Sequence, residues 1–346
     1  MKRTMHALTA TLIAGVIAIV PAAAQTAAPE IKFDSVPNAL QLPAGLYLGE
    51  VGGVATNSKG DLFVYTRNGH PTVTIGTARP FAHGGSRLYQ FDRSGKFVQE
   101  VAKDTYGFMV AAQVRVDPSD NLWVVDQFTN MVMKFDPQGR VAMLLGRKAE
   151  SENVPARTPP AGDGAGQQTD LFNRPTDVAW DAAGNIFVAD GEGNARIAKF
   201  DKDGKFTKSW GKRGSAPGEF TSVLSIAVDA EGNVYAADGG NKRVQVFDNN
   251  GTFKTAFTNV GNAQAMCITK GPNQILYVSN SNPPNDIDFA GEIYRMRLDG
   301  TITGKFGRAG KLLKEFGTVN AIDCRGENTL YVGELGNLRV QKVVLH

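Results

Sequence analysis

The stretch Ala183-Gly-Asn-Ile-Phe-Val-Ala-Asp190 joins a glycine turn to an apolar strand, and it determines the expected fold because it recurs through the chain. Glycine accepts the positive φ of a tight turn, and apolar residues bounded by turn residues are typical of a β-strand. Units of this kind that return every 42 to 64 residues indicate a repeat architecture rather than unrelated domains. The six copies occupy residues 59–66, 119–126, 183–190, 231–238, 273–280 and 327–334.

A second unit, Phe200-Asp-Lys-Asp-Gly-Lys-Phe206, has the composition of a β-hairpin turn between two further strands. Each repeat therefore supplies four antiparallel strands, which predicts an all-β chain folded as a six-bladed β-propeller. Its counterparts are at residues 91–97, 135–141, 247–253 and, in shortened form, 298–302.

The sixth repeat ends after its third strand, so its fourth strand must come from another part of the chain. The segment Ile31-Lys-Phe-Asp-Ser-Val36 is the natural donor. Pairing it with the C-terminal strand would close the ring and remove a free sheet edge.

Residues 1–24 are predicted to be a signal peptide, which predicts a periplasmic or secreted protein. Lys2 and Arg3 precede the apolar run Leu12–Val20, and Ala22-Ala23-Ala24 offers the small-x-small pattern before a cleavage site. The mature domain is then residues 25–346, and no later segment is long and apolar enough to span a membrane.

The charge of the mature chain argues against a nucleic-acid partner. Loss of Lys2 and Arg3 with the leader lowers the formal charge from +3 to +1, and no basic run remains to bind a phosphate backbone.

Two further features leave alternatives open. Cys267 and Cys324 lie in neighbouring repeats, where they form either a disulfide or two buried thiols. Residues 147–173, rich in Pro, Gly and polar side chains, are predicted to be a flexible inserted loop on one rim, with function left open.

The third strands of three repeats, 194–200, 241–247 and 337–343, share an Asn-x-Arg-[Ile/Val] pattern that resembles the NHL-repeat family. Within it, the stretch from Leu48 to His346 resembles peptidyl-α-hydroxyglycine α-amidating lyases, most strongly at Phe172-Asn-Arg-Pro-Thr-Asp-Val-Ala-Trp-Asp181. The block Tyr65-Thr-Arg-Asn-Gly-His70 resembles the arginine-bearing stretch near the first blade of those lyases.

That resemblance implies a zinc ion held by three histidines on the inner strands of alternate blades, at positions matched here by Ala112, Leu224 and Asn320. None of these supplies an imidazole. Glu192 and Gly239 stand where the lyases have a catalytic tyrosine and a second arginine, and only Arg67 is retained.

The histidines of the mature chain, His70, His83 and His346, cannot form such a site, because the first two share a blade and the third is the last residue. Zinc is therefore not expected. A structural calcium on axial backbone carbonyls, which the resemblance also implies, is left open.

Arg67 and His70 are the candidate catalytic residues, since an arginine can clamp a carboxylate and a histidine can move a proton near neutral pH. The alternative is a pair of ordinary surface-loop side chains. His83 is a candidate ligand-binding residue in an insertion of the first blade, where it is either part of a lid over the channel mouth or part of a glycine-hinged loop.

Asn130, Glu192 and Asn320 are candidate ligand-binding residues, because all three are expected to line the central funnel. A further set of polar side chains ends the second strands. We interpret these as structural acceptors for loop N–H groups. They are Asp126, Asp190, Asp238, Asn280 and Glu334.

Two function classes follow. In the first, the chain is a binding module that presents its funnel or loop face to a peptide, a small molecule or a protein, without the zinc chemistry of the lyases. In the second, it is a diverged lyase or hydrolase that acts through Arg67 and His70. A gluconolactonase-like calcium hydrolase is a third, weaker option. Apolar patches on one face would favour a protein partner, whereas a deep polar funnel would favour chemistry.

Overall fold

The computed structural model describes residues 28–69, 85–146, 171–283, 286, 288–326 and 328–346, together with the backbone of 72–75 and 79–82. The predicted signal peptide, His70 and His83 lie outside the described residues, and so do residues 147–170 of the predicted rim loop. Within the described part of the chain, no helix is long and apolar enough to cross a membrane.

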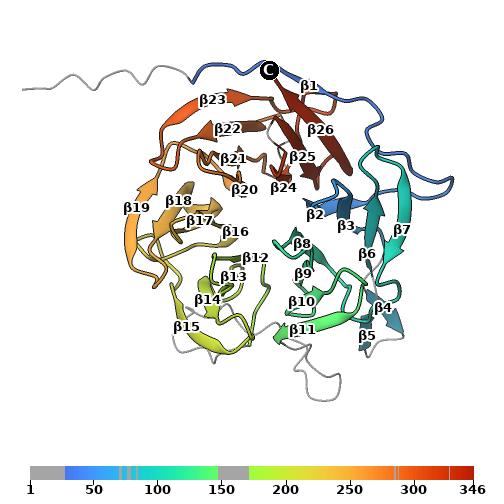
Figure 1. Ribbon diagram of the computed structural model, residues 1–346, viewed down its shortest axis with the longest axis horizontal. Helices are drawn as coiled ribbons and strands as arrows, with labels where there is room; N and C mark the ends of the chain where they lie inside the picture. Colours follow the sequence, from blue (N-terminus) through green and yellow to red (C-terminus); the bar gives the residue numbers. More distant parts are fainter. Residues whose placement is uncertain are drawn as a thin grey trace, which may run out of the picture.

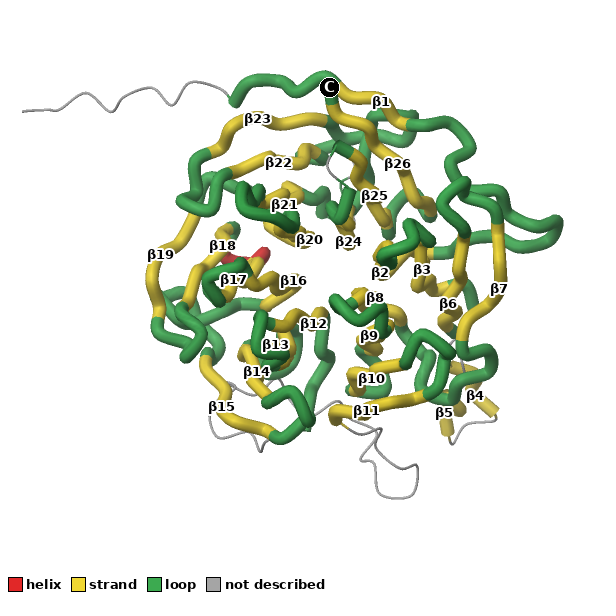
Figure 2. Tube along the Cα trace, in the orientation of Figure 1, coloured by secondary structure: helices red, strands yellow, loops and turns green. Residues whose placement is uncertain are grey.

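Six four-stranded antiparallel sheets surround a central axis, as the repeats predict (Figure 1). The fold is a six-bladed β-propeller. Apart from the short η1 (Gly239–Asn241), the regular structure of the described residues is β-strand (Figure 2).

Each blade has one strand beside the axis and three more at increasing distance from it. In this order from the axis outward, blade 1 contains β2 (Glu50–Thr56), β3 (Leu62–Arg67), β6 (Ser86–Phe91) and β7 (Phe97–Val101), and blade 2 contains β8 (Ala111–Val116), β9 (Leu122–Asp126), β10 (Met131–Phe135) and β11 (Val141–Gly146). Blade 3 contains β12 (Asp177–Trp180), β13 (Ile186–Asp190), β14 (Arg196–Phe200) and β15 (Phe206–Trp210), and blade 4 contains β16 (Val223–Val228), β17 (Val234–Asp238), β18 (Arg243–Phe247) and β19 (Phe253–Phe257). Blade 5 contains β20 (Ala263–Ile268), β21 (Leu276–Asn280), β22 (Glu292–Met296) and β23 (Ile302–Phe306), and blade 6 contains β24 (Val319–Asp323), β25 (Thr329–Glu334), β26 (Arg339–Leu345) and β1 (Phe33–Ser35).

The first blade carries one addition to this plan. Between β3 and β6, the strands β4 (Thr72–Ile75) and β5 (Arg79–Ala82) form a separate two-stranded sheet.

The N-terminal strand closes the ring, as predicted. β1 pairs antiparallel with β26, so that Phe33 lies opposite Leu345 in the outermost position of blade 6. Side chains reinforce this closure, because Asp34 forms ion pairs with Lys314 at 2.8 Å and with His346 at 2.9 Å. Both ends of the described chain thus lie in one sheet, where β1 covers the edge that β26 would otherwise expose.

The core consists of apolar clusters between neighbouring blades rather than one central mass. Between blades 1 and 2, for example, Tyr65 and Leu88 pack against Phe108, Val114 and Phe135. The middle strands read as continuous apolar runs because each is covered on both faces by the adjacent sheets.

Cys267 and Cys324 form a disulfide with a Cα–Cα distance of 6.0 Å, which decides between the two alternatives left by the sequence. It joins β20 of blade 5 to the residue that follows β24 of blade 6. The bond therefore holds two neighbouring inner strands together where both end.

Candidate functional site

One end of the propeller collects the polar side chains that the sequence singled out, and we call it the loop face. It is the end at which the inner strands begin and the second strands finish, since these strands run antiparallel. The register places Arg67, the last residue of β3, directly opposite Glu50, the first residue of β2.

Arg67 spans the boundary between blades 1 and 2. Its Nε donates to the backbone oxygen of Ala111 at 2.8 Å, and its Nη1 forms an ion pair with Glu50 Oε2 at 3.0 Å. Its Nη2 reaches Gln127 Oε1 only at 3.5 Å, and 24% of the side chain is exposed. The guanidinium is therefore held in place while one nitrogen keeps donor capacity for a ligand.

The contacts continue into blade 3. Gln127 donates to Glu192 Oε1 at 3.1 Å, and the other oxygen of Glu192 forms an ion pair with Arg174 at 2.5 Å. We call the series Glu50, Arg67, Gln127, Glu192 and Arg174 the mouth chain. It alternates acceptors and donors across three blades at the mouth of the ring.

The structure connects some of the predicted site residues and separates others. Asn130, with φ 57°, accepts a hydrogen bond from the backbone N–H of Arg174 at 2.8 Å and so positions that residue. Asn320 lies nearer the axis, whereas His346 is at the outer edge, against Asp34. Sequence reasoning missed Gln127 and Arg174, although both lie in loops beside residues that it had selected.

The inner strands share a feature that explains where Ala112, Leu224 and Asn320 lie. In β2, β8, β16 and β24 the register skips one residue, so two residues of the inner strand oppose one of its neighbour. The extra residues are Gly52, Ala112, Leu224 and Asn320. Such bulges re-aim a side chain next to functional sites, and three of these positions belong to alternate blades 2, 4 and 6.

The residues at these three positions do not fit a zinc ion. Ala112 and Leu224 carry no ligand atom, and the Asn320 amide is already bonded to protein groups. Its nitrogen donates to Gly52 O at 2.6 Å and Ala112 O at 3.1 Å, and its oxygen accepts from Gln264 at 2.9 Å. Among the described residues, no group of three His, Cys, Asp or Glu could hold a metal ion.

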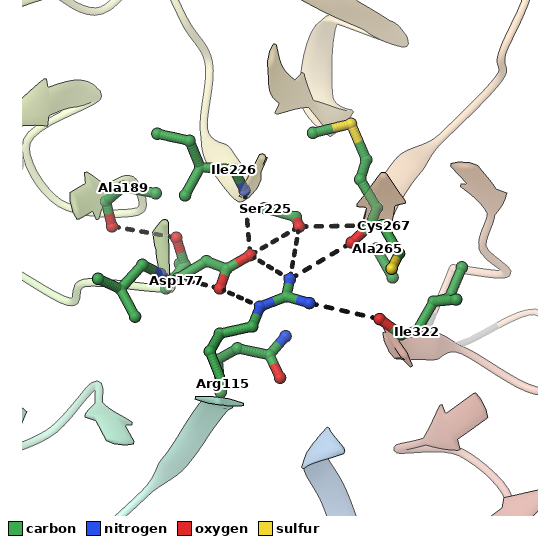
Figure 3. A network of polar contacts seen from close by, with 12 residues as sticks. Arg115, Asp177, Ala189, Ser225, Ile226, Ala265, Cys267 and Ile322 are labelled. Atoms are coloured by element: carbon green, nitrogen blue, oxygen red, sulfur yellow. Dashed lines mark hydrogen bonds and ion pairs between the residues drawn. The ribbon is translucent and has the colours of Figure 1, made fainter. Parts of the chain in front are cut away.

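Farther from the loop face than the bulges, the side chain of Arg115 extends from blade 2 across the axis (Figure 3). It forms a bidentate ion pair with Asp177 of blade 3, with Nε–Oδ1 at 2.9 Å and Nη2–Oδ2 at 2.6 Å. Burial opposes the charge of the guanidinium, but the Asp177 carboxylate outweighs it, and the pKa of Arg115 lies above its ordinary value. The middle of the ring is thus crossed by protein atoms.

The polar residues that end the second strands are structural acceptors, as the sequence predicts. Asp190, Asp238 and Glu334 pair with Arg196, Arg243 and Arg339, the arginines of the NHL-like strands, at 2.8 to 3.0 Å. Each also accepts from a backbone N–H of the preceding loop.

In blade 2, a tyrosine hydroxyl and backbone N–H groups bond the strand-end acid in place of an arginine. Asp126 accepts from the Tyr65 hydroxyl at 2.9 Å and from the backbone N–H groups of Met109 and Val110. Burial raises the pKa of Asp126, and these hydrogen bonds partly offset the shift.

The comparisons with known proteins agree with this architecture. Residues 168–285 match a family model described as a 6-bladed beta-propeller. At 13% identity and a TM-score of 0.56, a streptogramin B lyase structure covers 91% of this chain, and 98% of that chain is covered in return. A likeness at this identity shows the fold alone.

The chain is a six-bladed β-propeller related to amidating lyases and NHL-repeat proteins. It is 30% identical over 263 residues to peptidyl-alpha-hydroxyglycine alpha-amidating lyase 1 of Drosophila melanogaster, covering 68% of this chain and 45% of the relative. It is 25% identical over 277 residues to NHL repeat-containing protein 3 of Homo sapiens, covering 75% of this chain and 72% of that protein.

It is also 29% identical over 239 residues, 63% of this chain, to peptidyl-glycine alpha-amidating monooxygenase of Mus musculus. The match covers 23% of that longer protein.

Asp323, at the opposite end of the inner strands, gives a pH-dependent prediction. Burial raises the pKa of this half-buried carboxyl, and a hydrogen bond from Thr56 Oγ1 at 2.6 Å and the charges of Arg325 and Arg115 partly offset the shift. The folded state therefore binds this proton more tightly than the unfolded chain does. The ionised carboxylate lowers stability above its folded pKa, and that cost disappears below the ordinary pKa.

We expect Asp323→Asn to raise the thermal midpoint at about pH 8, with the gain shrinking as the pH falls toward about 4. Scanning calorimetry across this range measures both trends. Asp92→Asn is the matched control of opposite sign, because a hydrogen bond from the Ser94 hydroxyl lowers the pKa of Asp92. A lower midpoint for Asp323→Asn at the alkaline end would contradict the assignment.

Proposed function

We propose that this chain is a peptide-binding propeller whose loop face receives the end of a peptide at the mouth chain, without zinc chemistry. The observation that carries the proposal is the alternation of acids, arginines and an amide from Glu50 to Arg174. A line of both acceptors and donors complements a peptide, which also presents both, better than it complements a polyanion.

The loop face also carries most of the exposed large apolar side chains among the described residues. They lie in strand connections at this end of the propeller, including Phe128 beside Gln127 and Leu171 near Arg174, with exposed fractions of 47% and 41%. Exposed apolar side chains gathered on one face support a protein or peptide partner. The remaining members are Tyr106, Phe289, Leu312, Leu313 and Leu338.

Arg67 is the residue we assign to the ligand. A carboxylate that approaches Nη2 replaces only the 3.5 Å contact with Gln127, while the shorter contacts with Ala111 and Glu50 keep the guanidinium oriented. The names of two relatives describe action on peptidyl substrates, which supports a peptide as ligand.

The proposal is tested with fluorescein-labelled peptides that end in apolar residues and a free carboxylate, compared with the same peptides in amidated form. We expect the free acids to bind more tightly in fluorescence anisotropy. Arg67→Ala should weaken their binding about ten- to a hundredfold, because a charge-assisted hydrogen bond contributes about 1.5–3 kcal/mol.

Arg87→Ala is the matched control, since Arg87 is an exposed arginine of the same blade that pairs with Glu100 at 3.6 Å. Its binding should equal that of the wild type. Equal loss in both variants, or no preference for free acids, would contradict the role of Arg67.

A diverged lyase or hydrolase is the second candidate, favoured by the accessible Arg67 together with His70, which lies outside the described residues. Mass spectrometry of the same peptides after incubation distinguishes the two functions. Unchanged peptides support a binding module, and cleaved or dealkylated products support the enzyme.

We also propose that the chain is exported and loses residues 1–24. The Cys267–Cys324 disulfide supports this location, because disulfides persist in oxidising compartments. After expression in a bacterial host, the protein in the periplasmic fraction should begin at Gln25 by intact mass. An uncleaved chain found only in the cytosol would contradict export.

A further inference from the structure

Five oxygen atoms from four blades converge on the Arg115 guanidinium at the axis (Figure 3). The Asp177 carboxylate of blade 3 supplies two of them, at 2.6 and 2.9 Å from the guanidinium nitrogens. Ser225 Oγ, Met266 O and Ile322 O, from blades 4, 5 and 6, each lie 3.3 Å away. We call these five oxygens the axial cage.

This set has the composition of a site for a hard divalent cation. Calcium prefers carboxylate, hydroxyl and backbone carbonyl oxygens, six to eight in number with water included, in flexible geometry. The Asp177 side chain is fully buried, so its charge needs a cation close by. Among the described residues, the guanidinium is the cation that occupies the cage, and it enters from β8.

The carboxylate is also held independently of Arg115. Asp177 Oδ2 accepts from Ser225 Oγ at 2.7 Å and from the backbone N–H of Ile226 at 3.0 Å, and Oδ1 accepts from the N–H of Val178 at 2.8 Å. Removal of the guanidinium therefore leaves the oxygens of blades 3 and 4 oriented toward the axis.

A second side chain, that of Asn320, also donates hydrogen bonds to oxygens around the axis, nearer the loop face than Arg115. The Asn320 amide donates to two carbonyl oxygens of the inner strands, those of Gly52 and Ala112. Together, Arg115 and Asn320 link all six blades through axial acceptors and supply from the protein what a bound cation would supply.

We propose that Arg115 is a built-in cation that fills a latent calcium site, and that the axial cage binds calcium once this side chain is removed. A tethered cation cannot dissociate or be chelated, so the ring keeps its axial link at any calcium concentration.

The test is thermal unfolding of the purified protein and its variants in EGTA, in millimolar magnesium and in millimolar calcium. The wild type should show the same midpoint in all three. Arg115→Ala should lose on the order of 10 °C in EGTA, because it leaves a buried carboxylate unpaired. Calcium should restore at least half of that loss, and magnesium less, since it dehydrates reluctantly.

Two further variants make the result specific. Arg115→Ala with Asp177→Asn removes the carboxylate of the cage, so calcium should no longer raise its midpoint. Arg115→Gln keeps a polar side chain and adds an oxygen, so it serves if the alanine variant does not fold. Calorimetric titration of it with calcium should give one site per chain.

Either of two results would overturn the proposal. One is a calcium response of equal size in Arg115→Ala and in the double variant, which would place the ion elsewhere. The other is the absence of any calcium binding or rescue in both Arg115→Ala and Arg115→Gln.

Discussion

Arg115 leaves the inner strand of blade 2 and meets the Asp177 carboxylate of blade 3 at the axis, with Nη2 2.6 Å from Oδ2. From there its other hydrogen bonds reach blades 4, 5 and 6. Each blade packs mainly on its two neighbours, so contacts around the ring are local. The guanidinium joins non-adjacent blades directly, as the Asn320 amide also does between blades 6 and 2, and breaking the buried Arg115–Asp177 pair costs about 3–5 kcal/mol. The closure of blade 6 by β1 completes the ring from the outside.

In this ring, the mouth chain lies at one end, the loop face. The inner strands carry bulges at Gly52, Ala112, Leu224 and Asn320, and the resemblance to the lyases implies a zinc ligand at the last three. Here Ala112, Leu224 and Asn320 form no set of zinc ligands, and the mouth chain places charged side chains at the loop face. The mouth chain is accessible to solvent, with 24% of the Arg67 side chain and 47% of the Glu50 side chain exposed, and the proposed binding function rests on it.

Much of this architecture was predictable from the sequence, because it depends on local repeats. Turn-and-strand units with regular glycines, such as the one ending at Asp190, specify blades, and the missing strand of the last repeat pointed to Ile31–Val36. The structural role of the strand-end polar residues was also predictable, since a polar acceptor returns at this position in blades 2 to 6. The long-range contacts were not. Arg115 and Asp177 are 62 residues apart, and nothing local distinguishes Arg115 from any other polar residue of an alternating strand. Gln127 was overlooked because only its cross-blade contacts with Arg67 and Glu192 give it a role.

We propose that protein groups, not metal ions, fill the axial positions at which the resemblance to the amidating lyases implies zinc or calcium. The most direct test is the metal content of the purified mature protein, prepared without chelators and measured by inductively coupled plasma mass spectrometry against protein concentration. We expect neither zinc nor calcium in stoichiometric amount. One zinc per chain would contradict the assignment of Ala112, Leu224 and Asn320, and one calcium per chain would contradict the role of Arg115 as the resident cation of the axis.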